Sequence, residues 1–504
     1  MDILDFLHFG LEVFTLNNVL WLVLGSIVGV ILGALPGLSP TIGIAIFIPI
    51  TFNLEPATAL IVLGAIYVLG SYGGNITAIL INTPGTSDSF FMTFDGYPMT
   101  VRGEGLRAIG ITTVSAFIGG IIGTMLLVFI APPIALFAVK FGPLEKFLTM
   151  TMGLVIIIAL SKDKMFKGFI STCVGFLCSM VGLDIVTGLP RFTFGIDQIY
   201  EGLPLVPVVL GIFAISQVFC LIAERSESIA IDRSDMRGSV FLELRDFISM
   251  GINNIRASII GFIVGVIPGA GTTVAAGISY DLAKKGDPHP ETFGKGNEQG
   301  LASVSAANNA VVGGSLVPLL TLGIPGNGTA AVFLGGLYIH GLAPGTRLFT
   351  QNIKEVYSLF WGLIIAQFLI LVFGMYGAPI YEKVTRVANS IVVPIVTVFC
   401  VLGAYVFRYQ IFDILLIIFF GLIGYYIRRA NIPIIPFILA YILGRSAEME
   451  LRRALYLMEG RALSVIMKPL PLFLLAIDLL FLISPFWNDI KKYLKGRKEL
   501  SNVK

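Results

Sequence analysis

Long apolar runs, each about as long as a bilayer is thick, constrain this chain more than any other feature. A helix that crosses the hydrocarbon core needs roughly 20 mainly apolar residues. Runs of about that length occupy residues 19–35, 108–130, 166–186, 203–223, 248–267, 358–376 and 469–487. With the shorter apolar runs between them, we expect about 10 to 13 membrane segments.

The composition agrees with a chain that lies mostly in lipid. Of 504 residues, 56% are hydrophobic and 13% are charged, whereas roughly 25% are charged in a soluble domain. Backbone groups in hydrocarbon must be satisfied internally, so only helices and closed barrels span a bilayer. The runs lack the ten-residue alternation of barrel strands. We therefore predict an all-α polytopic membrane protein in the lipid bilayer and exclude a water-soluble globule.

The N-terminal segment is expected to remain as the first span. It is preceded by acidic residues such as Asp2, Asp5 and Glu12, and it has neither a basic region nor a small-residue cleavage site. A secretory signal peptide would show both of those features.

Signals for catalysis, metal binding or nucleic-acid binding are missing from the sequence. It contains no phosphate-binding loop ending in Gly-Lys-Ser/Thr, no His-Glu-x-x-His and no Gly-x-Ser-x-Gly. The cysteines, which lie in apolar segments and are expected to fill the core, are Cys173, Cys178, Cys220 and Cys400. We therefore expect no enzyme, no metal or cofactor site and no nucleic-acid partner.

Basic residues are distributed unevenly and indicate the orientation in the membrane. Residues 1–100 contain no Lys or Arg, whereas 224–256 carry five Arg. By the positive-inside rule, 224–256 are cytoplasmic and the N-terminus is outside, in the cell (inner) membrane. The basic C-terminal tail also has a cytoplasmic character. The apolar run at 432–443 is short and has Arg on both sides, so a full span and a re-entrant segment both stay open there.

Two motifs occur twice along the chain in the same order. Gly33-Ala-Leu-Pro-Gly-Leu-Ser-Pro-Thr41 matches Gly265-Val-Ile-Pro-Gly-Ala-Gly-Thr-Thr273. Asn82-Thr-Pro-Gly-Thr86 then matches Gly323-Ile-Pro-Gly-Asn327, and each is preceded by a Gly-Gly pair. We infer a duplicated half, with inverted topology as in many transporters.

The duplication suggests a division of the chain into four segments. Residues 1–223 form the first transmembrane half, and 224–256 form an Arg-rich cytoplasmic connection. The second half covers 257–430, and 431–504 hold the C-terminal membrane segments and the basic tail.

Each motif places a Pro-Gly pair inside or at the end of an apolar run. Proline removes a backbone donor and stops or kinks a helix. Such a break exposes carbonyl groups that can bind a cation, and amides at the next helix start that can hold an anion. Gly and Pro are also frequent in membrane helices for packing reasons alone. The pairing of four breaks by duplication favours the binding interpretation.

Amide and hydroxyl side chains near the breaks complete the candidate site. Asn308 and Asn309 are adjacent in an otherwise apolar run, which is costly unless they bond a ligand or another helix. The substrate- or ion-binding candidates are Pro36, Gly37, Ser39, Thr41, Asn75, Thr77, Asn82, Thr83, Pro84, Gly85, Pro268, Gly269, Thr272, Thr273, Ser305, Asn308, Asn309, Pro325, Gly326 and Asn327.

Charged residues next to the motifs have two interpretations. Asp88, Asp95 and Glu298 could lie at functional depth or simply at the ends of segments. Glu298 could sense sodium or protons, or it could favour a helix N-terminus. Asp184 precedes an apparent break at residues 188–190.

At these motifs the chain resembles the large membrane subunit of the tripartite tricarboxylate transporters, the TctA type. The stretches that carry the resemblance are 33–41, 72–86, 95–98, 266–273, 298–325, 341–345 and 443–455. The resemblance implies a permease that works with a small four-helix membrane subunit and a periplasmic solute-binding protein. It also implies citrate-like carboxylate substrates, with sodium or protons as the coupling ion.

Three other classes compete with this interpretation. An autonomous secondary transporter for another small organic anion would need no binding protein. A membrane-embedded enzyme would need clustered catalytic residues at segment ends, and a channel would show charge rings or filter repeats. The sequence shows neither clustered catalytic residues nor such repeats.

Overall fold

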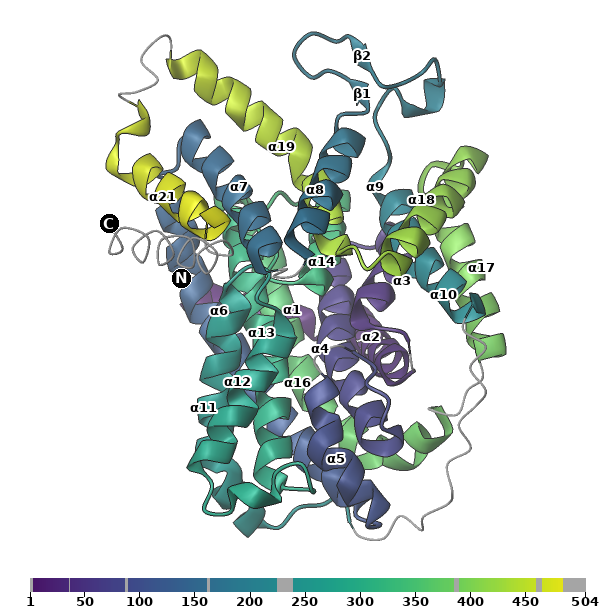
Figure 1. Ribbon diagram of the computed structural model, residues 1–504, viewed down its shortest axis with the longest axis vertical. Helices are drawn as coiled ribbons and strands as arrows, with labels where there is room; N and C mark the ends of the chain where they lie inside the picture. The colour runs from purple at the N-terminus through teal and green to yellow at the C-terminus, as the bar shows by residue number, and fades with distance from the viewer. Residues whose placement is uncertain are drawn as a thin grey trace, which may run out of the picture. The chain divides into compact units, whose positions relative to one another are not determined.

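A computed structural model describes residues 3–35, 37–86, 89–160, 164–223, 239–384, 389–458 and 465–483 (Figure 1). Several residues used in the sequence predictions lie outside this part of the chain. They are Pro36, Asp88, the first fifteen residues of the predicted connection (224–238) and the basic tail from residue 484 onward.

The architecture is helical, as predicted. Within the described ranges, nine helical segments are long and apolar enough to cross a membrane. They are α2 (Leu16–Ala34), α4 (Pro56–Ile81), α6 (Gly105–Ala138), α9 to α10 (Leu205–Ala223), α11 (Leu244–Val266), α13 (Glu298–Leu322), α16 (Ile353–Val384), α17 (Asn389–Arg408) and α18 (Ile411–Arg429). Shorter apolar helices are α3 (Pro40–Thr51), α8 (Met165–Ser179), α14 (Gly328–Ile339) and α21 (Pro469–Ile483). The prediction of an all-α polytopic membrane protein is confirmed.

Other elements connect or flank these helices. The remaining α-helices are α1 (Ile3–Val13), α5 (Met92–Val101), α7 (Pro143–Leu160), α12 (Gly271–Gly286), α15 (Thr346–Gln351) and α19 (Ile434–Met458). The span from α9 (Leu205–Val209) to α10 (Ser216–Ala223) contains a π-helical turn, η4 (Leu210–Ile215). The 3₁₀ turns are η1 (Ser89–Phe91), η3 (Asp197–Ile199) and η5 (Pro290–Thr292). In the described residues the strands are β1 (Gly182–Leu183) and β2 (Pro190–Arg191), paired antiparallel.

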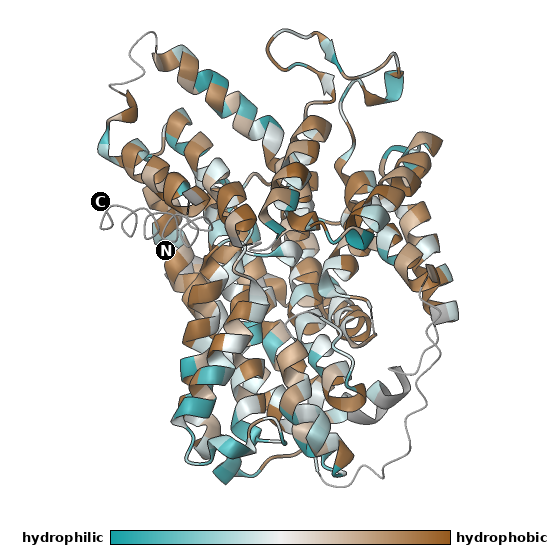
Figure 2. Ribbon diagram, in the orientation of Figure 1, coloured by the Kyte–Doolittle hydropathy of each residue, from teal (hydrophilic) through white to brown (hydrophobic). Residues whose placement is uncertain are grey.

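The described chain packs as two compact units. The first comprises Met1–Val139 with Pro204–Tyr426, and the second comprises Lys140–Leu203 with Ile427–Lys504. Figure 2 shows hydrophobic residues along most helices and hydrophilic residues at the lower ends of α11 and α12 in the first unit. Helix α11 begins within the segment predicted as a connection and continues into the predicted second half.

Two helices form the centre of the first unit. The membrane-spanning parts of α4 and α13 are completely buried, although both helices carry polar side chains such as Asn75 and Asn308. Helix α2 packs against α4, and α11 packs in the same way against α13. The next long helix of each copy packs against the central helix of the other copy. Helix α6 of the first copy packs mainly against α13, and α16 of the second copy packs against α4. The two copies of the repeat are therefore interlocked around the α4 and α13 pair.

Glycine allows these helices to approach closely. A Cβ atom at Gly119 of α6 would lie 2.1 Å from the carbonyl oxygen of Ala306 on α13. One at Gly261 of α11 would lie 2.3 Å from the carbonyl oxygen of Ala307. Small residues at such crossings bring backbones into van der Waals contact, which is the main attraction between helices in lipid.

The second unit is built on α7, α8, α19 and α21. Helix α8 meets α19 at Gly175, where a Cβ atom would lie 2.2 Å from the carbonyl oxygen of Phe437. The apolar run predicted at 166–186 is not one helix, because α8 ends at Ser179 and the chain turns into the β1–β2 hairpin at Gly182, whose φ is 115°. Helix α19 is continuous from Ile434 through the Arg-rich segment to Met458.

The glycine crossings predict that Gly119→Ala destabilises the protein. The added methyl group would have to displace the α13 backbone, and overpacking of this kind costs about 1–3 kcal/mol. We expect a clearly lower melting temperature in detergent. The matched control is Gly251→Ala in α11, where no atom lies within 4 Å of the added Cβ and helix propensity favours Ala. Equal melting temperatures for the two variants would contradict the close crossing.

Candidate substrate and ion site

The two central helices end in the same way. Helix α4 ends at Asn82, whose φ is 55°, and α13 ends at Gly323, whose φ is 74°. A left-handed residue at this position is a common helix terminator. Pro84-Gly85 and Pro325-Gly326 follow directly, so the predicted breaks lie at equivalent places in both copies.

Each of these two breaks contacts the end of the first long helix of its own copy, which is α2 in the first copy and α11 in the second. A Cβ atom at Gly85 would lie 2.6 Å from the carbonyl oxygen of Gly33, and one at Gly326 would lie 2.5 Å from that of Gly265. In the second copy the two breaks are also bonded, since the Gly269 amide donates to the Gly326 carbonyl oxygen at 2.9 Å. No residue larger than glycine fits this contact without moving the backbone.

The starts of two short helices, one from each copy, meet at these breaks. Helix α3 begins at Pro40 after Ser39, and α14 begins at Gly328 after Asn327. Thr41 Oγ1 lies 2.8 Å from Thr329 Oγ1. A helix N-terminus carries a partial positive charge and unpaired amide donors. The first turns of α3 and α14 therefore lie next to each other, each with one hydroxyl group at the contact, and helix starts of this kind suit an anion.

Tyr67 of the central helix α4 makes hydrogen bonds next to the start of α14. Its hydroxyl group donates to Asn327 Oδ1 at 2.8 Å and lies 2.8 Å from Ser315 Oγ. Asn327 Oδ1 also accepts from the Ala330 amide at 2.9 Å and so caps α14. The first copy of the repeat thereby holds the helix start of the second.

Three buried amide side chains form a second polar group. Asn308 Nδ2 donates to Asn75 Oδ1 at 3.4 Å, and Asn309 Nδ2 donates to the Ala116 carbonyl oxygen at 3.1 Å. All three side chains are at most 1% exposed. Within the described residues, Oδ1 of Asn308, Oδ1 of Asn309 and Nδ2 of Asn75 make no hydrogen bond. Leaving such atoms unsatisfied costs about 1–3 kcal/mol each, so a ligand here would recover that free energy.

Other predicted site residues bond backbone carbonyl groups or make no hydrogen bond to the rest of the predicted site among the described residues. Thr77 Oγ1 donates to the Gly74 carbonyl oxygen, Thr83 Oγ1 to that of Ile81, and Ser305 Oγ to that of Thr112 on α6. Thr272 and Thr273 lie in the first turn of α12, and among the described residues no hydrogen bond joins their side chains to other predicted site residues. Gly37 and Gly269 adopt φ values of 80° and 76° in the turns before α3 and α12, next to Pro268 in the second.

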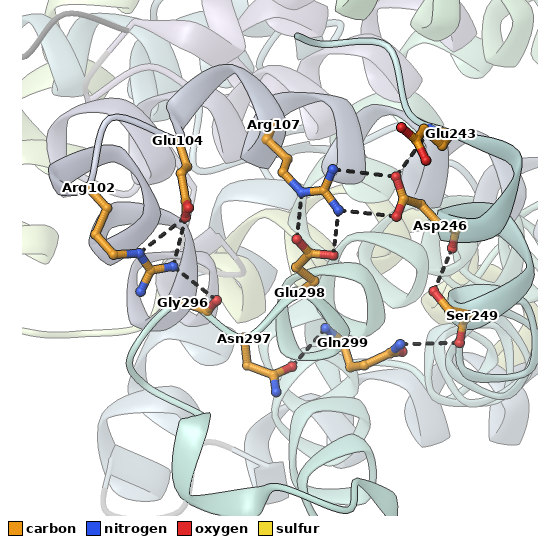
Figure 3. Close-up of polar contacts among 10 residues, drawn as sticks. All are labelled: Arg102, Glu104, Arg107, Glu243, Asp246, Ser249, Gly296, Asn297, Glu298 and Gln299. Carbon is orange, nitrogen blue, oxygen red and sulfur yellow. Dashed lines mark hydrogen bonds and ion pairs between the residues drawn. The ribbon is translucent and has the colours of Figure 1, made fainter. Parts of the chain in front are cut away.

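Sequence reasoning missed an ion-pair cluster at one end of the first unit (Figure 3). Arg107 of α6 contacts Glu298 of α13 with Nε to Oε1 at 2.6 Å, and its Nη2 lies 3.1 Å from Asp246 Oδ1 on α11. Asn297 caps the start of α13 by accepting from the Gln299 and Gly300 amides. Glu298 is therefore paired with a cation at a helix start. The sequence singled out Glu298 but not its partner Arg107, which stands at the beginning of a long apolar run.

Asp95 fixes the hydrophilic stretch that is inserted in the second copy. Its Oδ1 accepts from the amides of Gly294, Gly296 and Asn297, each at 2.8 Å, and its Oδ2 accepts from the Tyr280 hydroxyl group at 2.8 Å. The side chain is 1% exposed. Four donors satisfy this carboxylate, so Asp95 has a structural role within the described contacts.

Interlocked repeats, broken helices and a polar centre within an apolar bundle define a multi-pass membrane transport protein. The model of the tripartite tricarboxylate transporter TctA family matches residues 19–439. This chain therefore belongs to the TctA family, whose members are the large subunits of tripartite tricarboxylate transporters.

Curated relatives agree with this assignment. An uncharacterized 52.8 kDa protein in the TAR-I ttuC' 3' region of Agrobacterium vitis is 35% identical over 484 residues, or 95% of each chain. An uncharacterized protein in the TAR-II ttuC' 3' region of the same organism is 31% identical over 235 residues, which cover 46% of this chain and 96% of that protein. No solved structure matches.

The pairing with Arg107 predicts that Glu298 is not an ion-sensing group. We expect Glu298→Gln to leave any dependence of uptake on sodium or pH unchanged, with a loss of stability of at most about 1 kcal/mol because the pair is partly exposed. Glu104→Gln, which removes the partner of Arg102 on the surface, is the matched control. If Glu298→Gln folds normally and its uptake no longer depends on the ion, the assignment is wrong.

Proposed function

We propose that this chain is the permease subunit of a gradient-driven tripartite transporter that takes up citrate-like carboxylates with sodium or protons. The observation that carries the proposal is the meeting of the α3 and α14 N-termini at Thr41 and Thr329. An anion bound there is stabilised by two helix ends and by hydroxyl donors. No fixed positive charge has to be buried in the bilayer, where it would be costly.

A coupling cation has a separate place in the proposal. The unpaired Oδ1 atoms of Asn308 and Asn309 lie on the fully buried helix α13, and Asn75 on α4 is bonded to Asn308. Side-chain amide oxygens are among the neutral oxygen ligands that hard cations accept, and Asn308 and Asn309 offer theirs from within the continuous helix α13. Because the amide nitrogens link α4, α6 and α13, ion binding would bear directly on how these helices pack.

The basic test is uptake into proteoliposomes. We expect labelled tricarboxylates or related carboxylates to accumulate when the large and small membrane subunits, the binding protein and an ion gradient are all present. Uptake that needs the gradient but not the binding protein would indicate an autonomous transporter. If no carboxylate tested shows gradient-dependent uptake, the proposed function is wrong.

The anion site is tested by Thr41→Val combined with Thr329→Val. Removing both hydroxyl groups while keeping the side-chain shape should raise the half-saturating carboxylate concentration by about 10-fold or more, since each hydrogen bond to a charged group contributes about 1.5–3 kcal/mol. The control is Thr321→Val in α13, whose hydroxyl group bonds only the Val317 carbonyl oxygen of its own helix. An unchanged concentration dependence in the double variant would contradict the anion site.

The cation site is tested by Asn308→Ala combined with Asn309→Ala. We expect the ion concentration for half-maximal uptake to rise by about 10-fold or more, because the proposed oxygen ligands are lost. Ser303→Ala on the same helix is the control, since Ser303 bonds only the Gly300 carbonyl oxygen. If transport and ion dependence are unchanged in the double variant, these residues do not bind the ion.

A further inference from the structure

The β1–β2 hairpin and the loop after it present an unusual number of exposed apolar side chains. They are Leu183, Ile185, Val186, Leu189, Phe192, Phe194 and Ile196. Phe194 is 86% exposed, more than any other large hydrophobic side chain in the described residues. Figure 1 shows this segment as a loop that extends beyond α8, the helix that leads into it. We call residues 182–196 the apolar hairpin.

Ion pairs hold the base of the apolar hairpin to α19. Arg191 Nη1 lies 2.8 Å from Glu448 Oε1 and 3.3 Å from Asp184 Oδ2. Arg452 Nη2 lies 2.8 Å from Asp184 Oδ2 and 2.6 Å from Glu448 Oε1. Asp184 also accepts from the Thr187 and Val186 amides, and these bonds, with the Arg452 guanidinium, keep the pKa of Asp184 below its ordinary value. The hairpin is thus fixed at its base by two cations and two carboxylates.

Backbone strain is concentrated where the aromatic side chains project. Phe192 and Phe194 have φ values of 51° and 50°. A bulky residue in the left-handed region costs about 1–2 kcal/mol, and strain of this kind is found at binding sites more often than elsewhere. Both side chains are at least half exposed, at 50% for Phe192 and 86% for Phe194.

Chain connectivity places the apolar hairpin on one side of the membrane. The span from α9 to α10 begins at Leu205, directly after the hairpin region, and ends at Ala223. The residues that follow it carry Arg225, Arg233 and Arg237, so they are cytoplasmic by the positive-inside rule. Because a single span separates them, the hairpin lies on the outer side.

Charge argues against a lipid surface as the target. Within the apolar hairpin Asp184 and Arg191 balance to a formal charge of zero, and Asp197 and Glu201 follow it, so residues 182–204 carry −2. Segments that lie on membranes combine apolar side chains with Lys and Arg, which are attracted to anionic lipids. An apolar segment with acidic residues instead suits a protein pocket with a basic rim, and aromatic anchors dominate such interfaces.

We propose that the apolar hairpin is the docking point for the extracytoplasmic solute-binding protein, with Phe194 inserted into an apolar pocket that basic residues surround. This proposal rests on the proposed function, which supplies a soluble partner on the outer side. It assigns the contact to residues 182–196, and it makes the Asp184–Arg191–Glu448–Arg452 cluster the support that holds the anchor in position.

The test measures uptake into proteoliposomes as a function of the concentration of the purified binding protein. Phe194→Ser should raise the half-saturating concentration of the binding protein by about 10-fold or more, the effect of truncating an anchor residue, and leave the maximal rate unchanged. The control is Phe166→Ser, which removes a side chain that is 77% exposed on α8 in the same unit. If the wild-type chain responds to the binding protein and Phe194→Ser responds identically, the docking proposal fails while the proposed function stands.

A second measurement identifies the occupant directly. A photo-reactive phenylalanine analogue in place of Phe194, in cells that contain the whole transporter, should crosslink to the binding protein, detected with an antibody against it. Crosslinks only to the small membrane subunit, to a second copy of this chain or to lipid would overturn the proposal. If wild-type proteoliposomes show no uptake that depends on the binding protein, the proposed function has failed.

Discussion

The structure depends on one constraint: a polypeptide backbone in hydrocarbon must satisfy its own polar groups. In the described residues the Pro-Gly pairs at 84–85, 268–269 and 325–326 separate consecutive helices, and such interruptions are tolerated only where protein surrounds them or where they line a wet cavity. The two completely buried helices, α4 and α13, provide that environment. Gly33 and Gly265 let the breaks at Gly85 and Gly326 press against the backbone of the neighbouring helices.

This arrangement explains why the two innermost spans, α4 and α13, can carry buried polar side chains. In lipid there is no hydrophobic force that brings helices together, so close packing and interhelical hydrogen bonds do so. The Nδ2 atoms of Asn308 and Asn309 link α13 to α4, through Asn75 Oδ1, and to α6, while their own Oδ1 atoms have no partner among the described residues. The helix starts at Thr41 and Thr329 then provide donors for an anion. The residues that pack these helices together therefore lie in the same segments as the residues proposed to bind the anion and the cation.

Much of the fold could be predicted because its signals are local. Run length gave the membrane class, and the duplicated Pro-Gly motifs located the helix ends at Asn82 and Gly323. The supporting contacts could not be predicted, because they join residues far apart in the sequence. Tyr67 is one of two tyrosines in the apolar helix α4, and its bond to Asn327 spans 260 positions. The sequence indicated a break at residues 188–190 but not the earlier end of α8 at Ser179, because the residues between are mostly apolar, and Gly182 with φ 115° follows that end.

The central claim is that an anion binds where the α3 and α14 helix starts meet, and thiol labelling tests it most directly. Thr329→Cys, in a chain whose four native cysteines have been replaced, would be exposed to a charged, water-soluble maleimide in proteoliposomes. The account predicts that the thiol is labelled, because water reaches the broken helices, and that the transported carboxylate slows labelling at concentrations near those that saturate uptake. Labelling that no transported carboxylate slows, or a thiol that the reagent never reaches, would contradict the account.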